Sequence, residues 1–112
     1  DCIRGRKLTT IEDAVRMMTT VPAQLFGLRD RGVIAEGAHA DLVLFDPETV
    51  DSEMLSMVAD LPGGTERLYA GSVGVRSVFV SGVEVIHDGK PTDARPGTVI
   101  RSGTDTDTVT AS

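Results

Sequence analysis

The chain has 112 residues, 40% of them hydrophobic and 25% charged, which allows one globular domain with a single core and excludes a disordered chain. Its net charge is −6, with 17 acids against 11 bases, and this balance argues against nucleic-acid binding, which needs a clustered basic face. Three Phe, one Tyr and no Trp leave a core that must be mostly aliphatic.

The first predicted element is a helix in the stretch TTIEDAVRMMTT. Thr9 precedes it as the expected cap, and Glu12 stands three residues later, where a capping box places its carboxylate. Apolar residues then recur at helical spacing from Ile11 to Met18. The pattern predicts a helix with one apolar face.

A second, short helix is predicted in the stretch PAQLFG. Pro22 disfavours a continued helix but suits the first turn of a new one. Gly27 is typical of the residue just after a helix, because glycine adopts the left-handed conformation without steric cost. The sequence therefore predicts two helices that meet at a proline corner.

The run DLVLFD, residues 41–46, predicts a strand. Gly32 and Gly37 precede it in a segment that favours tight turns, and Pro47 follows it. Because the four central residues are all apolar, we expect this strand to be covered on both faces.

Residues 48–74 show no clear periodicity and are expected to form a loop, with a helical turn or two in SEMLSMVADL and a break at the PGG of residues 62–64. The clearest signal follows. VRSVFV, Ser81-Gly82, VEVIH and Asp88-Gly89 predict a hairpin with a two-residue loop and then a turn. Helices followed by short strands, without strand–helix alternation, predict the α+β class.

The C-terminal part has little to bury. ARPGTVIR is expected to add one more extended piece, and residues 102–112, SGTDTDTVTAS, are expected to form a disordered tail.

Two acids, Asp41 and Asp46, flank the predicted strand and invite an acid–base interpretation. Five residues of strand place their side chains on opposite faces and about 16 Å apart, at ~3.3 Å per residue. They cannot act on one substrate, so we interpret them as residues that end a strand and form turn hydrogen bonds.

His39 and Asp41 form an H-x-D pair that could face the same way, as a metal site requires. A catalytic zinc needs about three protein ligands, and the only further imidazole is His87, in a hairpin far along the chain. We therefore interpret both histidines as ordinary surface residues. We interpret Glu12 and Asp13 as residues of a helix start, because the positive end of the helix dipole favours their negative charge.

Cys2 is the only cysteine, which excludes an intrachain disulfide and a cysteine-rich zinc site and favours a cytoplasmic location. No histidine lies near it in the sequence, so we interpret it as a plain free thiol. The four methionines, at positions 17, 18, 54 and 57, are more typical of core filling than of a binding surface. No run is long enough to span a membrane, and no signal peptide opens the chain. Because it begins with Asp, we expect a processed or excised segment.

The segment LTTIEDAVRMMTTVPAQLFGLRDRGVIAEGAHADLVLFDPETV resembles the C-terminal end of the amidohydrolase superfamily of metal-dependent hydrolases. There a helix of the type T-x-E-E-A-V-x-x-x-T-x-x-P-A precedes G-L-x-x-R-G-x-I-x-x-G-x-x-A-D-L-V-x-F-D. VRSVFVSG is similar to the family's V-x-x-V-x-V-N-G hairpin, with Ser81 where Asn is usual. The closing ARPGTVI is similar to the N-acyl-D-amino-acid deacylase branch.

The resemblance implies that residues 1–30 are terminal helices of a (β/α)8 barrel in a parent protein, and that residues 31–101 belong to a small β-sandwich beside it. The parent would hold zinc at the barrel mouth, where activated water hydrolyses the amide of an N-acyl-D-amino acid. The family's ligand motifs have no counterpart here, and Cys2 does not match the metal-bridging cysteine of the deacylases. We therefore assign no catalytic, cofactor-binding or metal-binding residue to this chain and expect it to be inactive alone.

The expected partner is the rest of the parent polypeptide, and the isolated chain is expected to be marginally stable, to self-associate or to swap elements between copies. Neither nucleic acid nor membrane is an expected partner. Two alternatives stay open: a freestanding sandwich module without catalysis, and a deaminase or cyclic amidase of the same superfamily.

Overall fold

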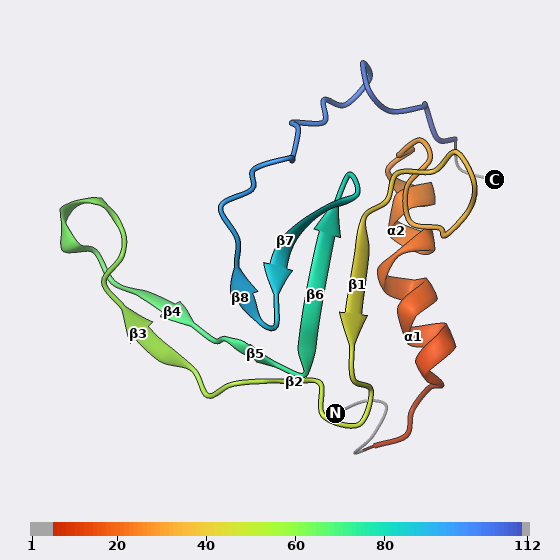
Figure 1. Cartoon of the computed structure of the whole chain (residues 1–112). Helices are drawn as coiled ribbons and strands as arrows, with labels where there is room; N and C mark the ends of the chain where they lie inside the picture. Colours follow the sequence, from red (N-terminus) through yellow and green to blue (C-terminus); the bar gives the residue numbers. More distant parts are fainter. Residues whose placement is uncertain (1–5, 111–112) are drawn as a thin grey trace.

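The structure, a computed structural model, describes residues 6–110. Two helices are followed by short antiparallel strands, which confirms the α+β class (Figure 1). The helices are α1 (Ile11–Met18) and α2 (Thr20–Leu25), and one 3-10 turn is η1 (Pro62–Gly64). The strands are β1 (Leu42–Phe45), β2 (Asp51–Ser52), β3 (Ser56–Val58), β4 (Arg67–Tyr69), β5 (Ser72–Val73), β6 (Val75–Val80), β7 (Val83–His87) and β8 (Lys90–Pro91).

Helix α1 begins one residue later than predicted. Thr10, not Thr9, is its cap, with extended backbone, and its hydroxyl accepts the amide of Asp13 at 3.2 Å. Asp13 therefore takes the place expected for Glu12. A helix in this register buries Ala14, and the two acids of its first turn lie where the helix dipole favours negative charge.

The corner between the helices lies at Thr19, whose backbone is not helical. Helix α2 starts two residues before Pro22, so the proline occupies the first turn rather than the first position. The predicted end at Gly27 is confirmed. The amide of Gly27 donates to the carbonyl of Gln24, and the amide of Leu28 donates to the carbonyl of Ala23. With Gly27 at φ +66, these two hydrogen bonds form a Schellman motif.

The main sheet has four antiparallel strands in the order β1-β6-β7-β8. Ser81 and Gly82 both have positive φ, +51 and +77, as the two-residue loop between β6 and β7 requires, so the predicted hairpin is confirmed. Asp88 and Gly89 repeat this geometry between β7 and β8. The expected turn is thus a second hairpin.

Strand β1 is present, but the expectation that it is covered on both faces is wrong for the described chain. It forms the sheet edge and pairs with β6 alone among the strands of residues 6–110. Val43 and Leu44 are each 54% exposed. The apolar side chains of β1 are therefore not buried by neighbouring residues of the described chain, although an all-apolar strand is typically buried on both faces.

Residues 51–73, here called the arm, form a long two-stranded antiparallel projection rather than the expected loop or helical turns (Figure 1). β2 pairs with β5, and farther out β3 pairs with β4. Pro62–Gly64 form the bend at its tip, where Gly63 and Gly64 have positive φ. The break expected at PGG is therefore a hairpin tip.

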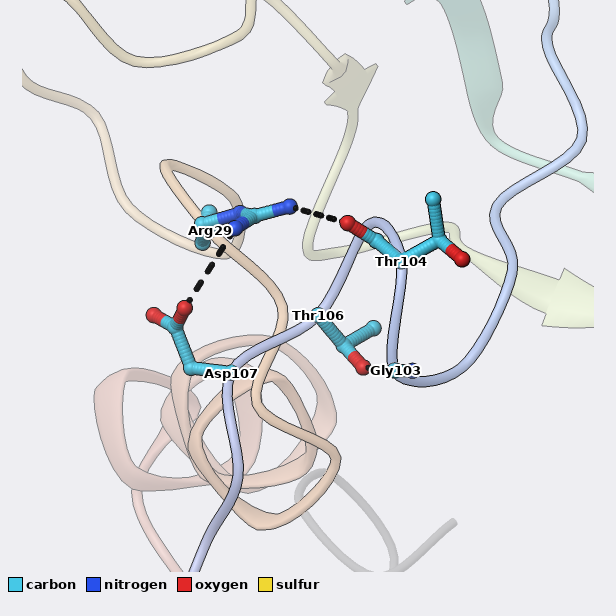
Figure 2. A network of polar contacts seen from close by, with 5 residues as sticks. All are labelled: Arg29, Gly103, Thr104, Thr106 and Asp107. Atoms are coloured by element: carbon cyan, nitrogen blue, oxygen red, sulfur yellow. Dashed lines mark hydrogen bonds and ion pairs between the residues drawn. The ribbon is translucent and has the colours of Figure 1, made fainter.

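The structure assigns no strand to residues 94–101, within which the sequence predicts an extended piece. The disordered tail expected at residues 102–112 stays a prediction. Residues 101–107, here called the strap, lie against the end of α2 (Figure 2). The amide of Asp107 donates to the carbonyl of Gly27 at 2.8 Å. Arg29 donates to the Thr104 carbonyl at 2.9 Å and contacts the Asp107 carboxylate at 3.5 Å.

The strap also holds its own shape. Arg101 and Asp105 exchange two hydrogen bonds of 2.8 Å, and the Gly103 amide donates to the Thr106 hydroxyl at 2.9 Å. Thr106 forms an isolated antiparallel bridge with Leu28. Polar and backbone groups, not buried apolar surface, therefore order this segment.

The buried apolar residues of the described chain are two alanines, Ala14 and Ala23. Many large apolar side chains on the helices, β1 and the arm are exposed. A core of the expected aliphatic kind is therefore not completed within residues 6–110. Within residues 6–110, neither helix has the length and hydrophobicity of a membrane span.

Candidate functional site

Asp41 is a structural connector. One carboxylate oxygen accepts the amide of Ser81 at 2.9 Å, and the other pairs with Arg31. The neighbouring carbonyl of Ala40 accepts the amide of Gly82 at 2.9 Å. The segment before β1 is thereby fastened to the β6–β7 turn, 40 residues away. Asp41 lies at the start of the strand as expected, but its carboxylate makes long-range contacts rather than the expected local turn hydrogen bonds.

Asp46 ends β1 in the same way. Its carboxylate accepts the amide of Glu48 at 2.9 Å, and its carbonyl accepts the amides of Thr49 and Val50. Its own amide donates to the Gly74 carbonyl. The predicted turn hydrogen bonds are thus confirmed for Asp46, whereas Asp41, at the other end of β1, joins distant segments.

His39 lines a pocket of about 420 Å³ between residues 28–31 and the segment 98–105. Its backbone amide donates to the Asp30 carbonyl at 2.8 Å. The pocket also contains Arg29, Arg31 and Asp105, so both signs of charge face it. The Asp41 carboxylate of the H-x-D pair is engaged by Arg31 and Ser81.

His87 lies at the end of β7, 66% exposed, with Glu84 and Asp88 beside it. Its Nδ1 is 2.8 Å from the Glu84 carboxylate, and this hydrogen bond raises the pKa of His87 above its ordinary value of 6.5. In return, hydrogen bonds from His87 and Ser77 lower the pKa of Glu84. This is a local ion pair on the surface, and its solvent exposure limits its strength.

The part of the chain that the structure describes holds no group of three or more His, Cys, Asp or Glu side chains that could bind a metal. The two histidines belong to different neighbourhoods, one beside residues 28–31 and one at the end of β7. Cys2 lies outside the described residues.

The remaining acids of the N-terminal helix differ in surroundings. Asp13 follows the Thr10 cap and has Arg16 at 3.7 Å. Glu12 lines a groove of about 890 Å³ between α1, residues 32–34 and β1. The groove is otherwise mostly apolar, with Ile11, Val15 and Phe45 among its lining. Such a surface suits packing rather than catalysis.

The methionines do not fill a core. All four are exposed, two on α1 and two in the arm, so the core-filling interpretation is wrong for the described chain. Their thioether side chains add to the exposed apolar surface of α1 and of the arm.

The arm contains a polar cluster that was not predicted from the sequence. Arg67 donates two hydrogen bonds, of 2.7 and 2.6 Å, to the carboxylate of Asp60, and its guanidinium lies 5.1 Å from the ring centre of Tyr69. The hydrogen bonds from Arg67 lower the pKa of Asp60, and Asp60 raises the pKa of Arg67. A seven-residue spacing across an unrecognised hairpin gives no signal in the sequence.

Comparison with known proteins gives a consistent result. Residues 1–92 match the sequence profile of the Amidohydrolase family. The N-acyl-D-glutamate deacylase of Alcaligenes xylosoxydans xylosoxydans is 38% identical over 99 residues, which are 88% of this chain and 18% of that protein.

Two solved structures are also similar. A crystal structure of D-aminoacylase matches with a TM-score of 0.62 at 38% identity, covering 82% of this chain and 18% of its own. The N-acyl-D-glutamate deacylase of Bordetella bronchiseptica, solved with zinc and a phosphonate mimic of the tetrahedral intermediate, matches with a TM-score of 0.55 at 43% identity. It covers 80% of this chain and 18% of its own. This chain thus spans less than a fifth of the length of each relative.

Proposed function

The chain belongs to the amidohydrolase family, and from this premise we propose that it is the C-terminal structural part of a longer hydrolase that cleaves the amide bond of N-acyl-D-amino acids. The observation that carries the proposal is its match to two solved structures, of a D-aminoacylase and of an N-acyl-D-glutamate deacylase, at 38% and 43% identity. Each match spans at least 80% of this chain and 18% of the larger one.

We propose that zinc and the catalytic groups are held by residues outside this chain. Zinc accompanies the deacylase of Bordetella bronchiseptica, and a catalytic zinc needs about three protein ligands. The described residues do not fit that requirement, because they include no group of three potential ligands. No catalytic step is therefore assigned to His39, Asp41 or His87.

The role proposed for this chain is mechanical. α1 and α2 would be the terminal helices of a barrel, residues 31–101 would contribute strands to the small sandwich, and the rest of the polypeptide would be their partner. The apolar groove beside α1 and the bare apolar residues of β1 support this proposal, since each is a surface that a neighbouring domain could cover. A cytoplasmic location belongs to the same proposal.

A substrate assay of the longer polypeptide tests the function. It is expected to release D-glutamate from N-acetyl-D-glutamate, the class of substrate that two relatives are named for, with much slower release from the L-enantiomer. The 112-residue chain, assayed alongside with added zinc, is expected to release none. Hydrolysis of a cyclic amide or deamination of a base, without action on N-acyl-D-amino acids, would support the alternative within the superfamily instead.

The isolated chain is proposed to be marginally stable and to self-associate or swap elements between copies. Its buried apolar residues in the described part are two alanines, whereas β1 leaves one edge unpaired there. Sedimentation and urea unfolding check this proposal. A monomer with a steep, cooperative transition would contradict it and would favour the freestanding module.

A further inference from the structure

The two faces of the outer arm differ in what covers them. In an antiparallel pair, residues directly opposite each other share a face. Ser56 is opposite Tyr69 and Val58 is opposite Arg67, so these four side chains lie on one face. Met57 is opposite Leu68, and this pair lies on the other face.

The first face is only partly covered, with Tyr69 45% exposed, but its charged groups are paired with each other. Arg67 lies over the ring of Tyr69 and is bound through two hydrogen bonds to Asp60, and Val58 beneath is half-buried. The charged groups of this face are therefore already paired. A partner docking here would have to displace or desolvate them.

The second face is bare. Met57 is 57% exposed and Leu68 is 65% exposed, although both are large apolar side chains in the centre of the strand pair. Leu55, just before β3, is exposed as well. The arm extends away from the four-stranded sheet and from both helices (Figure 1). An isolated two-stranded hairpin is marginally stable in water, so this geometry needs support from outside.

We propose that the Met57–Leu68 face of the arm is a docking surface for the part of the longer polypeptide that lies outside this chain. This inference rests on the proposed function and adds to it the face that makes the contact. The relatives are each more than five times as long as the segment they share with this chain, since that segment is 18% of their length.

Two occupants of the Met57–Leu68 face can be compared: the rest of the same polypeptide, which is covalently connected to the arm, and a second copy of the chain, which is not. A segment joined to its partner by a short, flexible connection that spans the two sites meets it at an effective concentration on the order of millimolar. A separate copy reaches its partner only at its own, lower concentration. The intramolecular contact is therefore favoured at the same apolar face.

Methionine oxidation in the longer polypeptide tests the proposal. Hydrogen peroxide is the probe, and sulfoxide at Met57 is followed by peptide mass spectrometry against free N-acetylmethionine amide. If the face is docked, Met57 is expected to oxidise at least about tenfold more slowly than the reference compound, because a covered thioether is inaccessible to peroxide. Leu68→Ser is expected to restore faster oxidation, whereas Ser56→Ala, on the opposite face, is expected to leave the protection unchanged.

Three results would overturn the docking proposal. The first is oxidation of Met57 at the rate of the reference, and the second is protection that disappears on dilution, which would indicate a second copy. The third is equal loss of protection in Leu68→Ser and Ser56→Ala. The readout is independent of hydrolysis: an active enzyme with unprotected Met57 contradicts the docking face alone, and an inactive polypeptide with protected Met57 contradicts the substrate proposal alone.

Discussion

The four-stranded sheet and the arm are both antiparallel, and both turn through residues with positive φ, yet they differ in what covers their side chains. Most residues of β6 and β7 are half-buried, and the turn between them is fastened by Asp41. In β3 and β4 nearly every residue is exposed. The sheet is supported by contacts within this chain, whereas the arm has backbone pairing without a covered apolar face.

Hydrogen-bond pairing alone therefore does not identify a part of the chain that is stable without outside contacts. Antiparallel pairing satisfies the backbone in both regions, but stability comes mainly from apolar area removed from water. We therefore expect the sheet and the arm to open separately, with the arm at lower free energy.

The largest effect is expected at Gly74, the junction of the two regions. It has φ +76, and a Cβ there would lie 2.5 Å from the amide nitrogen of Val50. Gly74→Ala is expected to lower the free energy of opening of both regions by at least about 1–3 kcal/mol, from backbone strain alone. Hydrogen exchange of β6 and β4 peptides measures this.

Gly37→Ala is the matched control for that change. It imposes a similar positive φ, +82, where a Cβ would have no neighbour within 4 Å. If both variants reduce protection equally, the close approach to Val50 is not what holds the junction.

The second prediction compares two turns. Gly82, in the sheet, and Gly63, at the arm tip, have nearly equal φ, +77 and +75, and an added Cβ would come no closer than 3.8 Å to another residue at either site. Gly82→Ala is expected to lower the opening free energy of the sheet by about 1–2 kcal/mol, the cost of a left-handed alanine. Gly63→Ala is expected to change arm exchange only. Equal loss of sheet protection in both would mean that arm and sheet unfold together.

The strap gives a third, smaller effect. A Cβ on Gly27 would lie 2.0 Å from the carbonyl oxygen of Asp107, so Gly27→Ala is expected to release residues 101–107 to fast exchange and proteolysis. Arg29→Ala removes the exposed pair with Asp107 and the hydrogen bond to the Thr104 carbonyl, and it is expected to weaken the strap by roughly 1 kcal/mol. A strap that stays protected in Gly27→Ala would contradict its docked position.

The smallest effect concerns pH at the end of β7. The pKa of His87 is raised, so its stabilising contribution is complete below the ordinary value of 6.5 and is lost as pH rises through the raised value. The pKa of Glu84 is lowered, so its contribution is complete above the ordinary value of 4.5 and is lost on acidification through the lowered value. Local protection of β7 should therefore be greatest between about pH 4.5 and 6.5.

An NMR titration of the His87 ring checks this in wild type and in Glu84→Gln. The pKa of His87 is expected to lie above 6.5 in wild type and closer to 6.5 in the variant, because the variant lacks the Glu84 carboxylate. An unchanged titration curve in Glu84→Gln would show that the hydrogen bond does not form in solution.

The elements that the sequence predicted well are those defined by local chemistry. Ser81-Gly82 and Gly27 need positive φ, and each marks its turn or helix end. The arm could not be predicted, because DSEMLSMVADL has no strand periodicity and its pairing depends on distant partners, such as Tyr69 for Ser56. The strap could not be predicted either, since Asp107 is held by the backbone of Gly27 and by Arg29, 78 residues earlier.

For the candidate site, the sequence correctly identified Asp46 as a turn residue and placed Asp41 at the strand end, but it did not reveal the distant partners of Asp41. The Asp41–Ser81 contact joins residues 40 apart, which only the fold brings together. The family resemblance was readable because its signature is local, in the helix and in ADLVLFD, and residues 1–92 match the family.

The most direct test of the central claim is metal content and deacylase activity of the longer polypeptide carrying His39→Ala and His87→Ala together. Because neither histidine belongs to a group of three potential ligands in the described chain, zinc content and kcat for N-acetyl-D-glutamate are expected to equal those of wild type. Loss of both zinc and activity in the doubly substituted protein would contradict the claim that this chain is structural.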